Sequence, residues 1–537
     1  MSAYLHYGMV SPFRIAREAD EIRREGSEGA EKYVDELLIW RELAQHWMHH
    51  GGTDQFGSVP EWARETLDKH KDDPRPSLHP KVALERAQTG DQLWDLAQQS
   101  LVRHGELHNN LRMTWGKALL HWTQDPQHAS WMLAHLNDTF ALDGSDPSSY
   151  GGLWWCLGLF DRPFEPERPI LGTVRPRDTV THASRLDLAR YRRVVGRLQP
   201  GRPQSVAVIG AGIAGLTAAR VLVDHGVSVT VFEKARGPGG RTSTRRTEAG
   251  RFDHGCPVFD SGDIGRWKDL GWIVFEGQSP RRGTRGANTV AKGLAAMIER
   301  ATPSNDLPPN RLRFQTRIGS IDQQADGRWR LHNEDGAELG SFGGVVVSAP
   351  PSQTAELLQP INERESERIA SVGTVPQWTA MVALAEPSGL EPAIVDFEDH
   401  DVLGKAVHTP NAEQEVGERW AIHATESWTR EHLELEKEDA AERLWKAFAR
   451  ELRERGCKVD EPTLLLGHRW RYAFSESDDF VDPIAPGLVV AGDWTCRSRW
   501  DAAPGMKATG IDRAVRSGHR AAFLLCNADN YSHAEGS

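Results

Sequence analysis

The residues whose types and spacing can do chemistry begin with three glycines. Gly210, Gly212 and Gly215 follow a short apolar run, Ser205–Ile209, with G-x-G-x-x-G spacing, and a helical pattern comes next. The first glycine permits a tight turn, the second lets the backbone approach a pyrophosphate, and the third lets helix and strand pack closely. The N-terminus of the helix would offer free N–H groups to the phosphates.

An acidic residue completes this pattern. A second apolar run, Val227–Phe232, ends at Glu233, where a carboxylate is placed to accept hydrogen bonds from a ribose. The alternative is a glycine-rich turn in an ordinary strand–helix unit. Because strand, glycines, helix, strand and acid all occur in order, we predict that these residues bind a dinucleotide.

The residues after the acid indicate which dinucleotide. Gly239, Gly240 and Arg241 stand in Gly237–Arg241, which resembles the second motif of the flavin amine oxidase superfamily. The resemblance implies FAD, with the glycine pair and the arginine along the flavin and its phosphates. It also implies that backbone near Ile318 meets the adenine, and that Asp493, in a run similar to the closing flavin motif, holds the ribityl chain.

Two further runs, Phe252–Gly255 and His468–Ala473, resemble the renalase-type branch of this superfamily. That branch oxidises dihydronicotinamide compounds, so the resemblance implies a small-molecule redox substrate and makes NAD(P)H a candidate donor. We expect four side chains in the catalytic pocket: His254, Trp378, Arg469 and Tyr472. The plain alternative for each is a side chain that only fills the core.

Residues 2 to about 191 resemble the FAD-binding helical domain of DNA photolyases, especially class II. The runs that carry this resemblance are Ala3–Gly8, Leu142–Pro147 and Glu167–Ile170. It implies a second candidate FAD site and DNA as a candidate partner. The family's N-terminal antenna domain and the start of its helical domain are absent from this sequence. Acidic residues outnumber basic ones in residues 1–199, which weakens the case for duplex binding.

Several roles carry over by resemblance. Trp94, Trp115 and Trp122 are similar in spacing to the family's chain of tryptophans that passes electrons to the flavin. The alternative is that the last two, seven residues apart, share one buried helix face.

The same resemblance places Arg112 beside the flavin ring, paired with Asp143 or Asp146, and Glu36 against the pyrimidine dimer. A solvated helix charge is the alternative for the glutamate. Where class II enzymes read Asp-Pro-Asn-Gly-Tyr, this chain has Ser148 in place of the asparagine that sits by flavin N5. We therefore expect weak or absent light-driven repair.

Composition limits the other classes of function. The net charge of −12 argues against a general polyanion binder, although a local basic groove is compatible with it. The five cysteines are scattered without a C-x-x-C pair, which predicts neither a metal site nor a disulfide framework. The sequence has no signal-peptide pattern and no apolar run near 18 residues, so we expect a cytoplasmic protein with no membrane segment.

The predicted fold class is multidomain: an all-α photolyase-like FAD domain, then an α/β Rossmann-type FAD domain with an inserted α+β substrate subdomain. The expected bounds are residues 1–198, a linker at 199–204, the oxidoreductase at 205–525 and a flexible tail at 526–537. Tyr33–His50 reads as one helix, and the substrate subdomain as residues 352 to about 475.

Three functions are compatible with these observations. The leading one is an FAD-dependent oxidoreductase, renalase-like, that takes hydride from a dihydronicotinamide-type donor and is fused to a photolyase-like flavin- or DNA-binding domain. The second is a photolyase-type DNA-repair flavoprotein whose oxidoreductase half supplies electrons. In the third, the helical half is a non-catalytic binding module.

Overall fold

The computed structural model divides the chain into two compact units, Met1–Gln199 and Pro200–Ser537. It describes residues 1–52, 56–256, 258–259, 264–276, 279–391, 393–409, 417–476, 480, 483–496 and 510–527. Most of the predicted tail, from residue 528 on, lies outside the described residues. The residues 196–204 that join the units contain no helix or strand.

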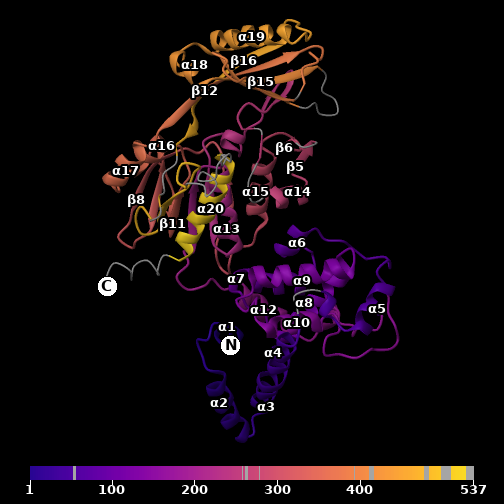
Figure 1. The fold of residues 1–537 in the computed structure, drawn as a ribbon. Coiled ribbons are helices and arrows are strands. Elements are labelled where there is room, and N and C mark those ends of the chain that lie inside the picture. Colours follow the sequence, from indigo (N-terminus) through magenta and orange to yellow (C-terminus); the bar gives the residue numbers. More distant parts are fainter. Residues whose placement is uncertain are drawn as a thin grey trace. The chain divides into compact units, whose positions relative to one another are not determined.

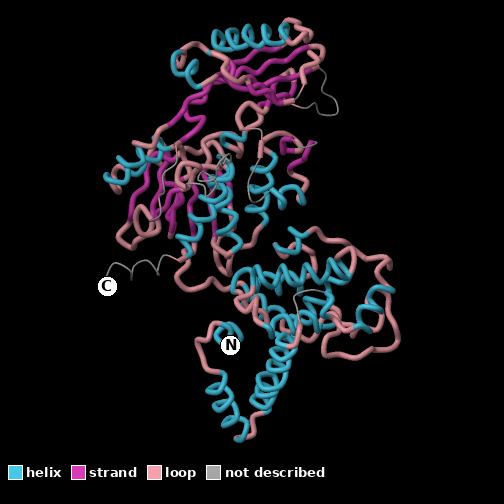
Figure 2. Tube along the Cα trace, in the orientation of Figure 1, coloured by secondary structure: helices cyan, strands magenta, loops and turns pink. Residues whose placement is uncertain are grey.

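The first unit consists of helices and loops in its described residues (Figure 2). Asp91 and Asp125 cap two of its longer helices, where each side chain accepts a hydrogen bond from a backbone N–H in the first turn. The α-helices are α1 (Ser2–His6), α2 (Pro12–Arg24), α3 (Glu28–Asp35), α4 (Arg41–His49), α5 (Glu61–Lys69), α6 (Lys81–Glu85), α7 (Gln92–His104), α8 (Asn109–Trp122), α9 (Pro126–Phe140), α10 (Pro147–Trp155), α11 (Thr179–Ala183) and α12 (Leu188–Val195).

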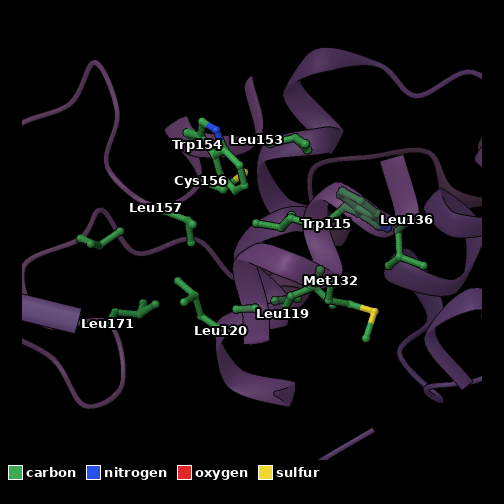
Figure 3. Packing of buried hydrophobic residues seen from close by; sticks show 14 of the residues in the cluster. Trp115, Leu119, Leu120, Met132, Leu136, Leu153, Trp154, Cys156, Leu157 and Leu171 are labelled. Carbon is green, nitrogen blue, oxygen red and sulfur yellow. The ribbon is translucent and has the colours of Figure 1, made fainter. Parts of the chain in front are cut away.

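Apolar faces of α8, α9 and α10 build the core of this unit. Figure 3 shows Trp115 and Leu119 from α8 near Met132 from α9, and all three side chains are buried. Burying a large apolar side chain stabilises the fold by about 1.5–3 kcal/mol. These three helices therefore fix the frame on which the candidate residues of the first unit are mounted.

The single helix expected over Tyr33–His50 is interrupted. A π-helical segment, η1 (Glu36–Trp40), separates α3 from α4. A π-turn adds one residue to the helical repeat, so it rotates the side chains that follow it relative to those before it, and such turns are frequent at functional sites. Apolar periodicity alone does not reveal this insertion, because both flanking segments keep a helical pattern.

A parallel sheet with strand order β17-β11-β1-β2-β7 forms the centre of the second unit. Its strands are β1 (Ser205–Ile209), β2 (Ser228–Phe232), β7 (Arg311–Arg313), β11 (Gly344–Val347) and β17 (Leu488–Val490). Helix α13 (Ile213–Asp224) packs against α15 (Thr289–Arg300) and α20 (Gly510–Cys526). Parallel strands joined through a helix are the Rossmann arrangement, so the predicted order of an all-α region followed by an α/β domain is confirmed.

A three-stranded antiparallel sheet, β10-β9-β8, lies beside the parallel sheet and shares its core. Its strands are β8 (Ile318–Gln323), β9 (Trp329–Asn333) and β10 (Glu338–Phe342). Helices α16 (Pro351–Leu358) and α17 (Glu363–Ala370) bury Leu358 and Ile369 in this same core. The substrate subdomain therefore begins after these helices, rather than at residue 352 as expected.

The subdomain is a five-stranded antiparallel sheet with strand order β13-β14-β15-β12-β16. Its strands are β12 (Thr374–Leu384), β13 (Ile394–Asp396), β14 (Leu403–His408), β15 (Glu418–Ala424) and β16 (Leu464–Ser475). Helices α18 (Glu426–Glu431) and α19 (Lys437–Glu454) cover one face (Figure 1). The opposite face is free to line a cavity.

Short elements complete the second unit. They are the hairpin of β3 (Arg245–Thr247) and β4 (Gly250–Phe252), helix α14 (Ile264–Asp269), and the hairpin of β5 (Ile273–Glu276) and β6 (Ser279–Gly283). Residues on β4 and β15 lie close together. This contact brings the segment after β4, which includes His254, near the subdomain sheet.

Candidate functional site

A cavity of about 1530 Å³ runs through the second unit, from the glycine-rich turn after β1 to the subdomain sheet. Eight of the nine residues predicted to bind the cofactor line it, and the ninth, Gly215, does not. These residues come from five separate elements. The fold therefore gathers into one wall the residues that the sequence motifs scatter over 284 positions.

The glycines leave space where the sequence predicts a pyrophosphate. Gly210 has φ of +106°, and a Cβ there would lie 2.2 Å from the Ser348 carbonyl oxygen. A Cβ on Gly215 would lie 2.1 Å from the Gly210 oxygen, so helix and strand are already in contact. A Cβ on Gly212 would meet no atom within 4 Å, because this residue opens onto the cavity at the start of α13.

Glu233 connects the turn after β1 to the turn after β2 by hydrogen bonds. Its carboxylate accepts hydrogen bonds from the backbone N–H of Ala211 at 2.8 Å and of Ala235 at 2.8 Å, and the residue is buried. Each carboxylate oxygen has two lone pairs, so capacity remains for a hydroxyl donor from the cavity. The arrangement is compatible with a ribose at this end.

Arg241 and Asp493 form an ion pair in the wall of the cavity. The guanidinium donates hydrogen bonds of 2.9 and 2.6 Å to the two carboxylate oxygens and a third, of 3.2 Å, to the Ala473 carbonyl. Burial lowers the pKa of Arg241, but Asp493 outweighs burial and raises that pKa above its ordinary value. This charged pair joins separate segments of the wall.

The subdomain sheet forms the other end of the cavity. Gln377, His423 and His468 line it from β12, β15 and β16. Trp378 does not: its side chain is buried among the residues that pack under α18 and α19. The pocket role predicted for Trp378 is wrong, because neighbouring residues of a strand point to opposite faces and its neighbour Gln377 takes the cavity side.

His254 lies at the same end. It is 5% exposed, and its ring centroid is 4.8 Å from that of His468 and 5.1 Å from that of Trp470. Burial, and then His468, lower the pKa of His254 to about 3, so the imidazole is neutral at pH 7. Its Nδ1 has no hydrogen-bond partner within the described protein, which leaves that atom for a ligand.

Arg469 and Tyr472 also line the cavity. The Arg469 guanidinium is held on the side of the helices, where it donates hydrogen bonds to the Leu433 carbonyl at 2.7 Å and to Glu434 at 2.9 Å. Lys405 and His423 were not anticipated from the sequence. Each is an isolated polar residue in its own strand, and only the pairing of distant strands brings them together.

In the first unit, Arg112 is the hub of a buried polar network. It donates hydrogen bonds to Asn137 at 2.7 Å, to Ser149 at 2.6 Å and to Asp143 at 3.2 Å. Burial raises the pKa of Asp143, but Arg112 and a hydrogen bond from Ser2 outweigh burial and hold that pKa below its ordinary value. Of the two acids predicted as its partner, the structure pairs Arg112 with Asp143.

Asp146 has other partners. It caps α10 by accepting a hydrogen bond from the Ser148 backbone N–H at 2.8 Å, and its other oxygen lies 3.3 Å from His6 Nδ1. The Ser148 hydroxyl is buried and has no hydrogen-bond partner within the described protein. Glu36 is about two-fifths exposed and forms an ion pair of 3.0 Å with Lys32, at the start of the π-helical segment.

The three predicted relay tryptophans are in contact. The ring centroids of Trp115 and Trp94 are 6.2 Å apart and nearly parallel, and those of Trp94 and Trp122 are 5.4 Å apart. Trp94 and Trp115 are fully buried, whereas Trp122 is partly exposed. The order in space is therefore Trp115, Trp94, Trp122, with the residue from α7 between the two from α8.

Two family models match the second unit. Residues 208–270 match the NAD(P)-binding Rossmann-like domain, and residues 260–525 match the flavin containing amine oxidoreductase family. A stretch of 54 residues is 46% identical to an L-amino-acid oxidase of Mus musculus and covers 10% of this chain and 9% of that protein.

The first unit is similar to photolyases. A deoxyribodipyrimidine photo-lyase of Methanothermobacter thermautotrophicus is 39% identical over 178 residues, which cover 33% of this chain and 38% of that protein. One from Oryza sativa subsp. japonica is 36% identical over 200 residues, 37% of this chain and 39% of that protein. The chain thus spans less than two-fifths of the length of these relatives.

Both predicted resemblances are confirmed in their coarse form. The chain joins an N-terminal region similar to photolyases to a C-terminal region that matches the flavin containing amine oxidoreductase family. Within the described residues, no helix is both long enough and apolar enough to cross a membrane. Those residues also contain no group of three or more potential metal ligands.

Proposed function

We propose that the second unit binds one FAD along the cavity and takes hydride from a dihydronicotinamide-type donor at its subdomain end. When bound there, FAD supplies a two-electron acceptor. The cavity fits this cofactor: Gly212 leaves room for the pyrophosphate at the N-terminus of α13, and Glu233 retains acceptor capacity for a ribose. Arg241 and Asp493 would hold the chain that leads to the flavin ring.

The observation that carries the choice of donor is the subdomain end of the cavity. His254, His423 and His468 are neutral there, because burial lowers their pKa values to about 3, 4 and 4. A neutral imidazole both donates and accepts hydrogen bonds, which suits a carboxamide group. The donor loses a hydride and leaves as an aromatic pyridinium, so this step requires no base to remove a proton.

The deciding experiment is anaerobic reduction of the flavin in the full-length protein. A dihydronicotinamide donor should bleach the flavin absorbance in a single turnover, and a primary amine should not. Rapid bleaching by amines with none by dihydronicotinamides would contradict the proposal. Replacing Gln377, which lines the cavity, with Leu should slow reduction, whereas the same change at Gln359, an exposed residue at the end of α16 that does not line the cavity, should have less effect.

A second function has support of its own. The polar network of Arg112 and the contacts among Trp115, Trp94 and Trp122 support a flavin site with an electron path in the first unit. We propose that this unit retains flavin or DNA binding, and that the oxidoreductase supplies electrons to it. The stoichiometry of bound FAD tests this: two per chain supports two flavin sites, and one per chain makes the helical unit a binding module.

The cysteines bear on the compartment. None of the five forms a disulfide bond in the described part of the chain, in keeping with a reducing environment. We therefore propose the cytoplasm as the location, and mass spectrometry of alkylated protein from cells would test it.

A further inference from the structure

A row of polar residues crosses the whole subdomain sheet at one level. Strand pairing places Asp396 opposite Lys405, Lys405 opposite His423, His423 opposite Thr379, and Thr379 opposite His468. Directly opposed residues of antiparallel strands project from the same face. Lys405, His423 and His468 line the cavity, so this face of the sheet is its floor.

Hydrogen bonds and ring contacts connect the side chains of this row. Thr379 and His423 are both buried and share a hydrogen bond of 3.0 Å between the hydroxyl and Nδ1. The row ends at His468, whose ring contacts that of His254, and the Nδ1 of His254 is a buried atom without a partner within the described protein. The row thus runs from the Asp396–Lys405 ion pair at one side to the His254 Nδ1 atom at the other.

Lys405 is the cation that faces this end of the cavity. Among the described residues of the subdomain that line the cavity, none is a carboxylate, and the charged ones are Lys405, Arg469 and Arg471. The two arginines pair with one exposed carboxylate, Glu434, on the side of the helices, so their charges are directed away from the floor. After burial, the charges that lower the pKa values of the three histidines are cationic or imidazole groups, among them Arg245 and Lys405.

The ion pair of Lys405 is exposed, so a ligand can compete for the lysine. Its ammonium is paired at 3.1 Å with Asp396, and the two side chains are 46% and 63% exposed. Ion pairs between exposed side chains contribute little to stability, because water screens them and both chains lose freedom. A ligand anion in the cavity can therefore compete for this lysine, whereas an ammonium ligand would be repelled by it.

We propose that the floor formed by Lys405, His423, Thr379 and His468 selects an anionic organic substrate and rejects an alkylammonium. The negative group of the substrate lies toward Lys405, and its uncharged polar ring lies against the neutral imidazoles and His254 Nδ1. This inference rests on the proposed function, because it assumes that the substrate occupies the subdomain end of the cavity. It separates this domain from oxidases whose substrates are cationic amines.

The test compares two ligands that share a ring and differ in charge. Benzoate and benzylammonium are titrated into the full-length protein loaded with FAD, and binding is followed by calorimetry and by the visible spectrum of the flavin. Benzoate should bind at least tenfold more tightly at low ionic strength, and the preference should shrink as salt is added. Equal or tighter binding of benzylammonium would overturn the inference.

Matched variants assign the effect to Lys405. Lys405→Gln should reduce the preference for benzoate severalfold, and Lys405→Arg should retain it. Lys446→Gln is the control, since Lys446 is an exposed lysine on α19 that pairs with Glu442. An unchanged preference in Lys405→Gln, with flavin content intact, would contradict the role of the row.

Reactive donors separate this inference from the proposed function. Dihydronicotinamide mononucleotide and 1-methyl-1,4-dihydronicotinamide share the hydride-donating ring, and only the first carries a phosphate. If neither bleaches the flavin but benzoate is still preferred, the proposed donor is wrong and the anion-selective floor stands. If both bleach it equally at all salt concentrations and benzylammonium binds as well as benzoate, the floor does not select by charge.

Discussion

Arg241 and Asp493, 252 residues apart in the chain, are joined by two hydrogen bonds of 2.9 and 2.6 Å between guanidinium and carboxylate. The arginine follows the glycine pair of the second motif, and the aspartate follows the last strand of the parallel sheet. A third hydrogen bond, from Arg241 to the Ala473 carbonyl, adds the end of β16. One guanidinium therefore connects three separate segments of the cavity wall.

Replacing Asp493 with Asn should loosen this connection. The neutral amide offers one acceptor oxygen in place of two, and its NH2 group faces the second guanidinium N–H. The charge of Arg241 then has no carboxylate to balance it at this buried position. Because the Arg241 side chain is 36% exposed, water moderates the loss, and we expect a decrease of about 1–3 kcal/mol in the free energy of unfolding. Flavin content should fall as well. Denaturant unfolding of Asp493→Asn beside Glu338→Gln, an exposed control on β10, measures the difference.

Gly212 should tolerate no large side chain if the pyrophosphate lies where the motif predicts. Gly212→Leu projects into open cavity, so the apoprotein should fold normally and lose most of its bound FAD. Gly265→Leu is the control, because Gly265 is exposed on α14 and its Cβ also meets no atom within 4 Å. The ratio of flavin to protein absorbance in purified samples is the measurement. Full flavin content in Gly212→Leu would contradict the placement of the pyrophosphate at Gly212.

These positions explain what the sequence could predict. The glycines and Glu233 belong to one continuous strand–helix–strand segment, so their spacing alone determines their placement. Lys405 and His423 could not be predicted, because they meet only through the pairing of strands β14 and β15. Trp378 was misplaced for a related reason: the sequence identified its strand but not which face of that strand meets the cavity.

In the first unit, too, some features could be predicted from the sequence and others could not. The tryptophan spacing predicted a relay, and the three rings are in contact, although the order in space puts Trp94 in the middle. The π-helical segment that begins at Glu36 left no signal in the apolar pattern. Apolar residues in a helix recur at intervals of three or four residues. A single inserted residue therefore leaves the apolar pattern looking helical.

The stability of the second unit should fall in acid because of its neutral histidines. Burial lowers the pKa of His423 from 6.5 to about 4 in the folded protein. The unfolded chain therefore takes up a proton there as the pH falls below 6.5, and the folded chain does not until about pH 4. The resulting stabilisation is complete above pH 6.5 and is lost as the pH falls, by about 1 kcal/mol per pH unit. Urea unfolding of wild type and His423→Gln at pH 7, 6 and 5 should give a shallower dependence for the variant.

The tryptophan contacts predict a light-dependent phenotype if the first unit holds a flavin. Trp94→Phe should slow photoreduction of that flavin at least tenfold, because it removes the only ring that contacts both Trp115 and Trp122 among the described aromatic pairs. Trp131→Phe is the control, since Trp131 is half exposed and stacks on His135 outside this path. Illumination under anaerobic conditions with an external reductant measures the rate. Equal rates in wild type and Trp94→Phe would mean that electrons take another route.

Light-driven repair of pyrimidine dimers should be weak or absent in the wild-type chain. The side chain at Ser148 is shorter than the asparagine of the class II motif that it resembles, and its hydroxyl has no partner within the described protein. The neighbouring ion pair of Arg112 and Asp143 is present, so the contribution of the Ser148 side chain can be tested by itself. Illumination of a dimer-containing oligonucleotide with the reduced protein should give little repair, and Ser148→Asn should increase it. Ser149→Ala, which removes an acceptor of Arg112, should not increase repair. Fast, stoichiometric repair by the wild type would show that the serine suffices.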